Sequence, residues 1–147
     1  MRMKSILAAS LAAALLMVFS GLFLEVYGAE PSGQKRQAQK IVQTAGRDRL
    51  GDFAPDFARY NDDILFGEVW SRNDKLSLHD RSIVTVSALV TSGVLDSSLK
   101  FHIASAKKNG VTKEEMVEII TQLGFYAGWP KAWAAFAMAK EVYGDGK

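Results

Sequence analysis

The spacing of apolar residues along the chain predicts helices from residue 53 onward. Apolar side chains recur at steps of three and four residues in the series Phe53, Phe57, Tyr60 and Ile64. Glu68 continues the same series. Side chains at this spacing share one face of an α-helix, so we expect this face to pack on the core. Asn73-Asp74 then breaks the pattern and ends the first predicted helix.

A second stretch, residues 78–92, is apolar on most sides. Its valines and isoleucine are β-branched and also suit a buried strand, so the pattern alone leaves two interpretations. Ser77 is a good N-cap, and Asp80 stands three residues later in the capping-box position. The cap and the length of the segment favour a buried central helix.

Start and stop signals indicate the remaining helices. Asp96 is a cap for a helix that Asn109-Gly110 ends with a left-handed residue. Thr112 with Glu115 forms a second capping box. Gly128-Trp129-Pro130 is a turn that places proline at the start of the last helix. The sequence shows no alternating strands, no glycine-rich phosphate loop and no internal repeat. We therefore expect an all-α fold, a compact bundle of about five to six helices joined by short turns.

Residues 1–29 have a different character from the rest of the chain. Two basic residues precede an uncharged run, residues 6–24, that is rich in Ala, Leu, Val and Phe. This is the layout of a secretory signal peptide, with cleavage expected after Gly28 or, as second choice, after Ala29. The run is also close to the ~20 residues of a membrane-spanning helix, so an uncleaved anchor is the alternative. Both interpretations place the domain outside the cytoplasm, either periplasmic or secreted.

Residues 30–52 are polar and basic and contain one proline and three glycines. Gln34 to Thr44 carries a thin apolar stripe that would suit a helix. We interpret residues 30–52 as a linker and N-terminal arm that packs on the domain or on a partner subunit. A loose tail is the equal alternative. Residues 53–147 then form the single domain.

The composition narrows the chemistry. The 147 residues are 48% apolar and 23% charged, which is enough for one packed domain. There is no cysteine, and this excludes disulfides, a thiol nucleophile, a CxxC redox pair and cysteine-ligated metals. His79 and His102 are the only histidines, so we expect no metal centre. The formal charge of +2 does not suggest a nucleic-acid partner.

Three ionisable residues stand where the helical pattern calls for apolar ones. They are Glu68, Arg81 and His102, one from each of three predicted helices. Buried charges are normally paired, so a Glu68–Arg81 ion pair with His102 hydrogen-bonded nearby is the structural interpretation. Their occurrence together in one small domain also fits a catalytic or binding site.

Aromatic residues offer walls for an apolar pocket beside such a site. They are Trp70, Tyr126, Trp129 and Trp133. Any one of them would serve equally well in core packing. His79 follows the Ser77 cap, and we expect it to be exposed.

Five short motifs follow one another along the chain. They are Phe66-Gly67-Glu68-Val69-Trp70-Ser71-Arg72, Asp80-Arg81-Ser82-Ile83-Val84-Thr85, Leu99-Lys100-Phe101-His102-Ile103, Asn109-Gly110-Val111-Thr112 and Tyr126-Ala127-Gly128-Trp129-Pro130-Lys131-Ala132. In this order and spacing they resemble the carboxymuconolactone decarboxylase family, over residues 53–143. The resemblance implies a small helical fold shared with alkyl hydroperoxidase D, and homo-oligomers that are trimers or hexamers. The hydroperoxidase branch works through a CxxC pair, so a chain without cysteine cannot share that thiol chemistry.

The same resemblance implies decarboxylation of 4-carboxymuconolactone or a related acid without a cofactor. Electron density left by the departing CO2 spreads through the ring double bond to the lactone oxygen. A cation or donor is needed there, and an acid is needed at carbon. By resemblance, Arg81 binds a carboxylate or the oxyanion, and His102 donates a proton or stabilises the oxyanion. Glu68 orients one of them or takes part in proton transfer, and Trp70, Tyr126 and Trp129 bind the substrate.

The expected partners follow from these interpretations. We expect a small-molecule substrate, no nucleic acid, and membrane contact only through an uncleaved N-terminus. Breakdown of aromatic compounds by this route is cytoplasmic, so predicted export makes another lactone or a β-keto-type acid a second candidate substrate. A non-catalytic binding or scaffold protein on the same fold is the alternative function.

Overall fold

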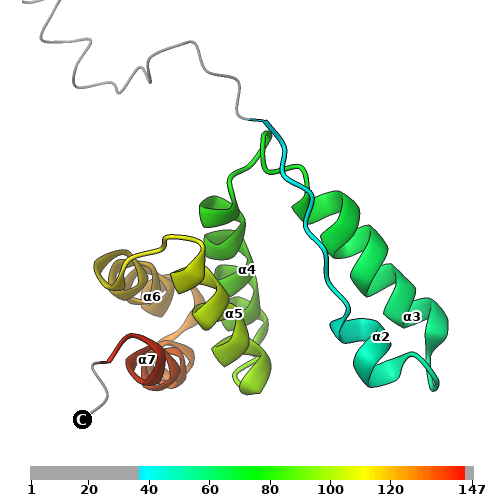
Figure 1. Cartoon of the computed structure of the whole chain (residues 1–147). Helices are drawn as coiled ribbons and strands as arrows, with labels where there is room; N and C mark the ends of the chain where they lie inside the picture. Colours follow the sequence, from blue (N-terminus) through cyan, green and yellow to red (C-terminus); the bar gives the residue numbers. More distant parts are fainter. Residues whose placement is uncertain (1–36, 145–147) are drawn as a thin grey trace, which may run out of the picture. The chain divides into compact units, whose positions relative to one another are not determined.

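The computed structural model describes residues 37–144, all of which belong to one unit, Arg36–Lys147. The described residues form helices and connecting loops without a strand, so the all-α prediction is confirmed (Figure 1). The predicted signal peptide or anchor lies outside them. None of the helices within residues 37–144 has the length and apolar character needed to span a membrane.

The last part of the chain folds into four helices whose ends match the predicted caps. They are α4 (Leu78–Ser92), α5 (Ser97–Lys108), α6 (Lys113–Ala127) and α7 (Trp129–Tyr143). Ser77 Oγ accepts the Asp80 N–H at 3.0 Å, and the Asp96 carboxylate accepts the Ser98 N–H at 2.8 Å. Both halves of the Thr112–Glu115 capping box are formed. These side chains satisfy backbone donors that the first turn of a helix leaves unpaired.

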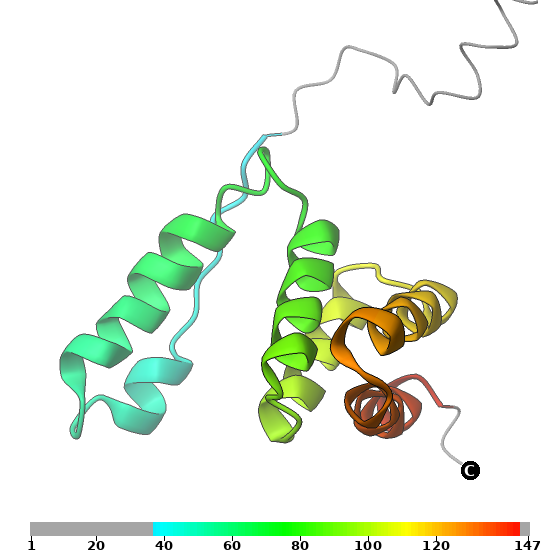
Figure 2. The same ribbon diagram turned by 180° about the vertical axis from the view of Figure 1, so that it is seen from behind.

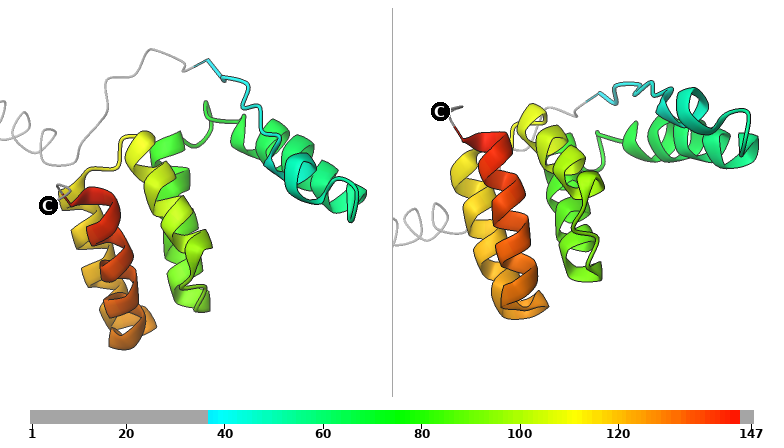
Figure 3. Two further views of the ribbon diagram at one scale, coloured as in Figure 1. Left: turned by 60° about the horizontal axis from the view of Figure 1, so that its bottom comes forward. Right: turned by 90° about the horizontal axis from the view of Figure 1, so that it is seen from below.

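Residues 78–92 form a helix, so the buried-strand interpretation is wrong. The helix ends at Gly93, whose φ of 81° lies in the left-handed region that glycine tolerates. Gly110 has a φ of 93° and follows α5 in the same way. Gly128, with a φ of 101°, stands between α6 and α7. Together these glycines let the chain reverse within a few residues, and α4 pairs with α5 while α6 pairs with α7 (Figures 2 and 3).

The hydrophobic core lies among α4–α7. Its largest fully buried side chains are Leu99, Ile103, Met116, Ile120, Val86, Val90 and Val111. Small residues of α7, at positions 132, 135 and 139, are also buried and allow neighbouring helices to approach closely. Contiguous burial of branched aliphatic side chains is the main favourable term for folding of a domain without disulfides.

The preceding segment has three helical pieces: α2 (Ala45–Leu50), α3 (Pro55–Arg59) and η1 (Tyr60–Trp70). η1 is a π-helix that continues directly from α3. Asp62 of η1 is buried, and its carboxylate accepts the N–H groups of Gly46 and Arg47 at 2.8 and 2.9 Å. A Cβ at Gly46 would stand 2.7 Å from that carboxylate, so glycine is required for α2 to pack here. Arg47 also pairs with Asp63 through its guanidinium.

Residues 37–44 are not helical, so the helix predicted from Gln34 to Thr44 is wrong for its described part. Their backbone groups bond to side chains of the following segment. Asn73 donates to Gln39 O at 2.7 Å and accepts the Gln39 N–H at 2.9 Å. The Ile41 N–H donates to Ser71 Oγ at 2.8 Å, and Lys40 Nζ donates to Gly67 O at 2.7 Å. The arm therefore packs along η1 in an ordered way.

The apolar series that predicts a core-facing stripe is exposed in the single chain. Phe53 and Phe57 are 89% and 60% exposed, and Tyr60 and Ile64 are also exposed. Glu68 is exposed too, so its expected place on a core-facing stripe is wrong. The i, i+4 argument assumes 3.6 residues per turn, whereas a π-helix bonds i to i+5 and shifts the register. The six-residue α2 is also too short to cover this face.

Candidate functional site

A pocket of about 530 Å³ lies beside the N-terminal half of α5. One wall comes from α5, and the other comes from residues of the arm, α2, α3 and η1. The lining residues are Gln43, Ala45, Gly46, Arg49, Leu50, Phe57, Asn61, Phe66, Ser97, Ser98, Phe101 and His102. Apolar and polar side chains contribute about equally to the walls, and the polar ones can orient a small molecule.

His102 is the titratable group of this pocket. It is half-buried on α5, and its ring meets the Phe101 ring edge-on, with centroids 5.2 Å apart and planes at 84°. Neither ring nitrogen has a hydrogen-bond partner within residues 37–144. Burial lowers the pKa of His102 below its ordinary value of 6.5, because the charged imidazolium loses hydration there. His102 is therefore neutral near pH 7, with one N–H donor and one acceptor nitrogen.

Arg49 is the one charged side chain among the lining residues. It is exposed and makes no ion pair or hydrogen bond with another described residue. No carboxylate lines the pocket in the part of the chain that the structure describes, so its charge balance favours an anion. Asn61 donates to Asp62 at 2.9 Å, which holds the amide in place at the pocket wall.

Arg49 and Asn61 carry no sequence signal that marks them as site residues. Arg49 lies in the segment interpreted as linker and arm. Asn61 lies in the first predicted helix, outside its apolar series. Neither residue interrupts an apolar series, which is the signal that selects Glu68, Arg81 and His102. Only the folded structure, in which Arg49, Asn61 and His102 line the same pocket, brings them to the histidine.

Glu68 and Arg81 do not line the pocket of His102. Glu68 is exposed on η1 and makes no ion pair, so the Glu68–Arg81 ion pair of the structural interpretation is not formed among residues 37–144. Arg81 is partly buried near the start of α4 and donates from Nη2 to the Arg72 carbonyl at 3.0 Å. Its Nε is buried without a hydrogen-bond partner. The structure thus brings His102 alone of the three into this pocket, and their catalytic roles stay predictions.

The predicted substrate-binding aromatics also lie outside the pocket lining. Trp70 packs against Phe66, which does line it, with ring centroids 5.8 Å apart. Tyr126 and Trp129 are exposed at the junction of α6 and α7. Trp129 covers Gly124, where a Cβ would stand 3.0 Å from its ring.

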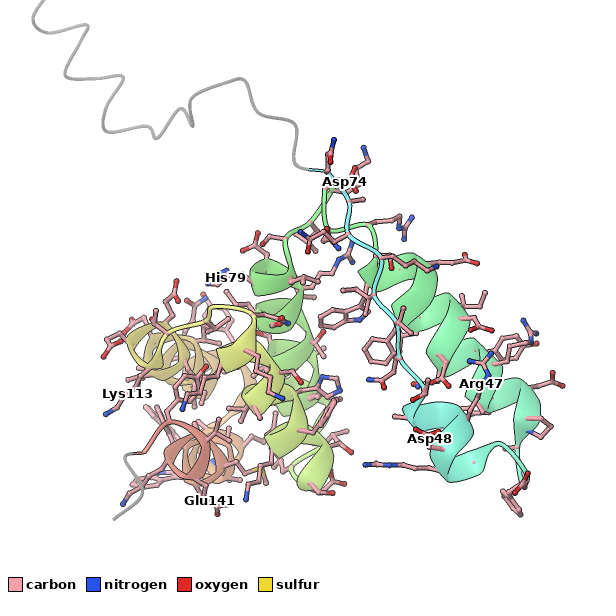
Figure 4. All side chains as sticks on the ribbon, in the orientation of Figure 1. Arg47, Asp48, Asp74, His79, Lys113 and Glu141 are labelled. Carbon is pink, nitrogen blue, oxygen red and sulfur yellow. The ribbon has the colours of Figure 1, made fainter. Side chains whose placement is uncertain are left out.

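A larger groove of about 1070 Å³ lies along α6 and α7. It is lined mostly by apolar side chains, with Lys113, Lys140 and Glu141 among them, and includes none of the predicted site residues. Figure 4 labels Lys113 and Glu141 at this part of the molecule. Its lining residues include no histidine and no buried polar side chain without a hydrogen-bond partner, so they do not indicate an acid–base site.

His79 occupies a separate cluster at the start of α4 (Figure 4). Its Nδ1 lies 3.0 Å from Asp80 and its Nε2 lies 3.3 Å from Glu115 of the α6 capping box. Asp80 and Glu115 raise the pKa of His79, because both carboxylates stabilise the imidazolium. His79 is only partly exposed and joins the N-terminal ends of two helices, so its role here is structural. Across the described part of the chain no cluster of three metal-ligating side chains occurs.

The pocket of His102 can bind a small anion and move a proton. The guanidinium of Arg49 offers paired N–H donors to a carboxylate. The neutral imidazole offers a donor to an oxygen that gains negative charge. The side chains of Phe57, Phe66 and Phe101 supply apolar surface against which a ring-sized molecule can pack.

Comparisons with known proteins agree with the motifs. The model of the carboxymuconolactone decarboxylase family matches residues 55–141. A 4-carboxymuconolactone decarboxylase of Acinetobacter baylyi is 42% identical over 98 residues, which cover 67% of this chain and 72% of that protein. An uncharacterised 15.0 kDa protein of Paracoccus denitrificans, from the nqo9–nqo10 intergenic region, is 27% identical over 111 residues, covering 75% of this chain and 73% of that protein.

Proposed function

Because the chain belongs to the carboxymuconolactone decarboxylase family, we propose that it is a carboxy-lyase that removes CO2 from a small carboxylated lactone without a cofactor. The observation that carries this proposal is the pocket in which the half-buried His102 shares the lining with Arg49, with three phenylalanines and with no carboxylate among the described residues. The 42% identity to a 4-carboxymuconolactone decarboxylase makes that lactone the first substrate to test.

The proposed reaction begins with cleavage of the bond between the γ-carbon of the ring and its carboxylate. The electron pair of that bond forms a new double bond between the γ- and β-carbons as CO2 leaves. The electrons of the old double bond then form a bond from the α-carbon to the carbonyl carbon, and the carbonyl π electrons move to the carbonyl oxygen. A proton then adds to the ring carbon next to the carbonyl. His102, neutral near pH 7, donates a hydrogen bond from its N–H to this carbonyl oxygen. In the alternative role of proton donor, its other ring nitrogen first takes up a proton from water and then passes it to the ring carbon.

Two further residues keep the roles that the family resemblance gives them. Arg81 binds a carboxylate or the oxyanion, and Glu68 orients a catalytic group or takes part in proton transfer. Neither lines the pocket of His102, so we propose that assembly of several copies completes the site. Exposed aromatic side chains on α6 and α7 support such an assembly, because large exposed apolar patches usually mark interfaces. Trimers or hexamers are the forms expected from the family.

The cellular location is part of the proposal. Residues 1–29 have the layout of a signal peptide, so we propose that the protein acts in the periplasm or after secretion, with an anchor formed by residues 6–24 as the alternative. An exported enzyme meets substrates other than those of cytoplasmic aromatic breakdown. Related carboxylated lactones and β-keto-type acids therefore belong in the substrate screen.

The competing function is non-catalytic binding of a small anion on the same fold. The specific observation in its favour is that Glu68 and Arg81 do not line the pocket of His102 in the single chain. A thiol peroxidase is excluded because the chain has no cysteine.

The test is a screen of 4-carboxymuconolactone and related lactones with the purified protein, in which loss of the substrate and release of CO2 are measured. We expect turnover of at least one lactone and a strong loss of kcat in Arg81→Ala and in Glu68→Gln. Full activity of both variants would remove these two residues from the site. Binding of lactones without any turnover would support the non-catalytic function instead.

A further inference from the structure

The pocket of His102 contains a cation that the family resemblance does not assign. We propose that Arg49 binds the carboxylate that the substrate keeps, and thereby orients the lactone so that the carboxylate to be lost lies against the apolar wall. This inference rests on the proposed decarboxylase function. It adds a substrate-binding residue from α2 to a site otherwise built around α5.

The charges around Arg49 leave its guanidinium without an internal partner. The carboxylates of Asp48, Asp62 and Asp63 are already engaged. Asp62 accepts hydrogen bonds from the Gly46 and Arg47 N–H groups, and Asp48 accepts one from the Thr44 hydroxyl. Asp63 pairs with Arg47. Arg49 therefore neither stabilises the fold through an ion pair nor neutralises another described residue, and its charge is available to a ligand.

The backbone that carries Arg49 is held in place. Asp62 is buried and anchors the first turn of α2 through two N–H groups. Burial alone would raise the pKa of Asp62, but the hydrogen bonds from Arg47, Asn61 and Gly46 hold it below its ordinary value. Asp62 thus stays ionised, and α2 presents Arg49 to the pocket from a fixed position.

Decarboxylation chemistry decides which carboxylate Arg49 binds. The carboxylate to be lost gives up its negative charge as CO2 forms. A guanidinium bound to it would stabilise the substrate more than the transition state and would slow the reaction. The retained carboxylate keeps its charge throughout, so binding it improves affinity without this penalty. The side chains of Phe57, Phe66 and Phe101 line the same pocket and suit the group that loses its charge.

The kinetic test compares Arg49→Gln with the purified wild-type protein on 4-carboxymuconolactone. Hydrogen bonds to charged groups predict a KM increase of about tenfold or more, with kcat changed by less than about threefold. Arg49→Lys should recover part of the loss, because it restores the charge without the planar fork. Arg59→Gln is the matched control: it removes the same charge from the neighbouring helix, at a residue that does not line the pocket. Its KM should not change.

A binding test separates this inference from the proposed function. Muconolactone keeps the side-chain carboxylate and lacks the one that is lost, and its methyl ester lacks both charges. Calorimetry should show that the wild-type protein binds the acid at least tenfold more tightly than the ester, and that Arg49→Gln abolishes the difference. This readout does not need turnover. Because Arg49 is exposed and unpaired among the described residues, Arg49→Gln and Arg49→Lys should have the same unfolding temperature as the wild-type protein.

The outcomes are distinct. If the wild-type protein turns over the lactone while Arg49→Gln keeps its KM and its preference for the acid, the role of Arg49 is refuted and the enzyme function stands. If no lactone is turned over but the acid preference exists and depends on Arg49, the anion site stands and the decarboxylase function fails. Equal affinity of the wild-type protein for acid and ester would overturn the inference directly.

Discussion

Replacement of Trp133 by glutamate should dissociate the proposed assembly. Trp133 lies on α7 and is 75% exposed in the single chain, and Tyr126 near the end of α6 is 83% exposed. Phe125 and Trp129 are exposed at the same junction. Side chains of this size are rarely left so open to water unless another surface covers them.

The magnitude follows from the exposed area. A buried tryptophan or tyrosine removes about 150–250 Å² from water. Covering three quarters of such an area at about 25 cal/mol per Å² contributes about 3–5 kcal/mol as an upper bound. Central aromatic residues of interfaces typically cost ~2 kcal/mol or more when truncated, so Trp133→Glu should weaken association by about thirtyfold or more.

Sedimentation of the wild-type protein and of Trp133→Glu across a range of concentrations measures this effect. Lys108→Gln is the matched control, because it changes the net charge by the same amount at an exposed position of α5. The control should sediment like the wild type, and Trp133→Glu should become smaller while its helical circular dichroism is retained. An unchanged mass for Trp133→Glu, or a wild-type protein that is itself a monomer, would refute the reasoning.

Two further predictions concern pH. Burial lowers the pKa of His102 below 6.5, and we expect the reaction to need the neutral form of this residue. The value of kcat/KM should therefore stay constant as the pH falls to 6.5 and should decrease only below that value. A profile measured from about pH 4.5 to 8 tests this. An acid limb above 6.5 would contradict a neutral His102. The pKa of His79 is raised by Asp80 and Glu115, so its stabilisation is fully present below 6.5 and is lost as the pH rises through the folded value. The free energy of unfolding, measured in urea, should be lower for His79→Gln than for the wild-type protein, and this difference should be larger near pH 6 than near pH 9. An equal difference at both pH values would assign the effect to packing.

The helices from residue 78 onward could be predicted closely because their signals are local. Ser77, Asp96 and Thr112 cap the helices that they were expected to cap, and Gly110 adopts the expected left-handed conformation. Such signals act over one turn, so one sequence is enough to recognise them.

The first part of the chain could not be predicted in the same way. Burial of Phe53 and Phe57 depends on which surface meets them, and periodicity carries no information about that surface. η1 has π-helical hydrogen bonds, so residues four apart do not lie on one face as they do in an α-helix. Glu68 therefore does not share a face with Ile64, although the i, i+4 spacing predicts that it does. The arm is ordered by single side chains, such as Asn73 and Asp62, rather than by a repeating pattern.

The candidate site was only partly predictable for the same reason. His102 stands out because it interrupts the apolar face of α5, and it does line a pocket. Arg49 stands more than fifty residues before it and breaks no pattern. Only long-range packing brings the two residues to one cavity, and such contacts cannot be read from the spacing of one sequence.

The central claim is that His102 works in a decarboxylase site. Release of CO2 from 4-carboxymuconolactone by the wild-type protein and by His102→Ala, at equal concentration and near pH 7, tests it most directly. We expect steady release by the wild-type protein and a rate at least a hundredfold lower in the variant, within the ~10²–10⁴ contribution of a positioned acid–base group. No release by the wild-type protein, or equal rates for the two proteins, would contradict the account.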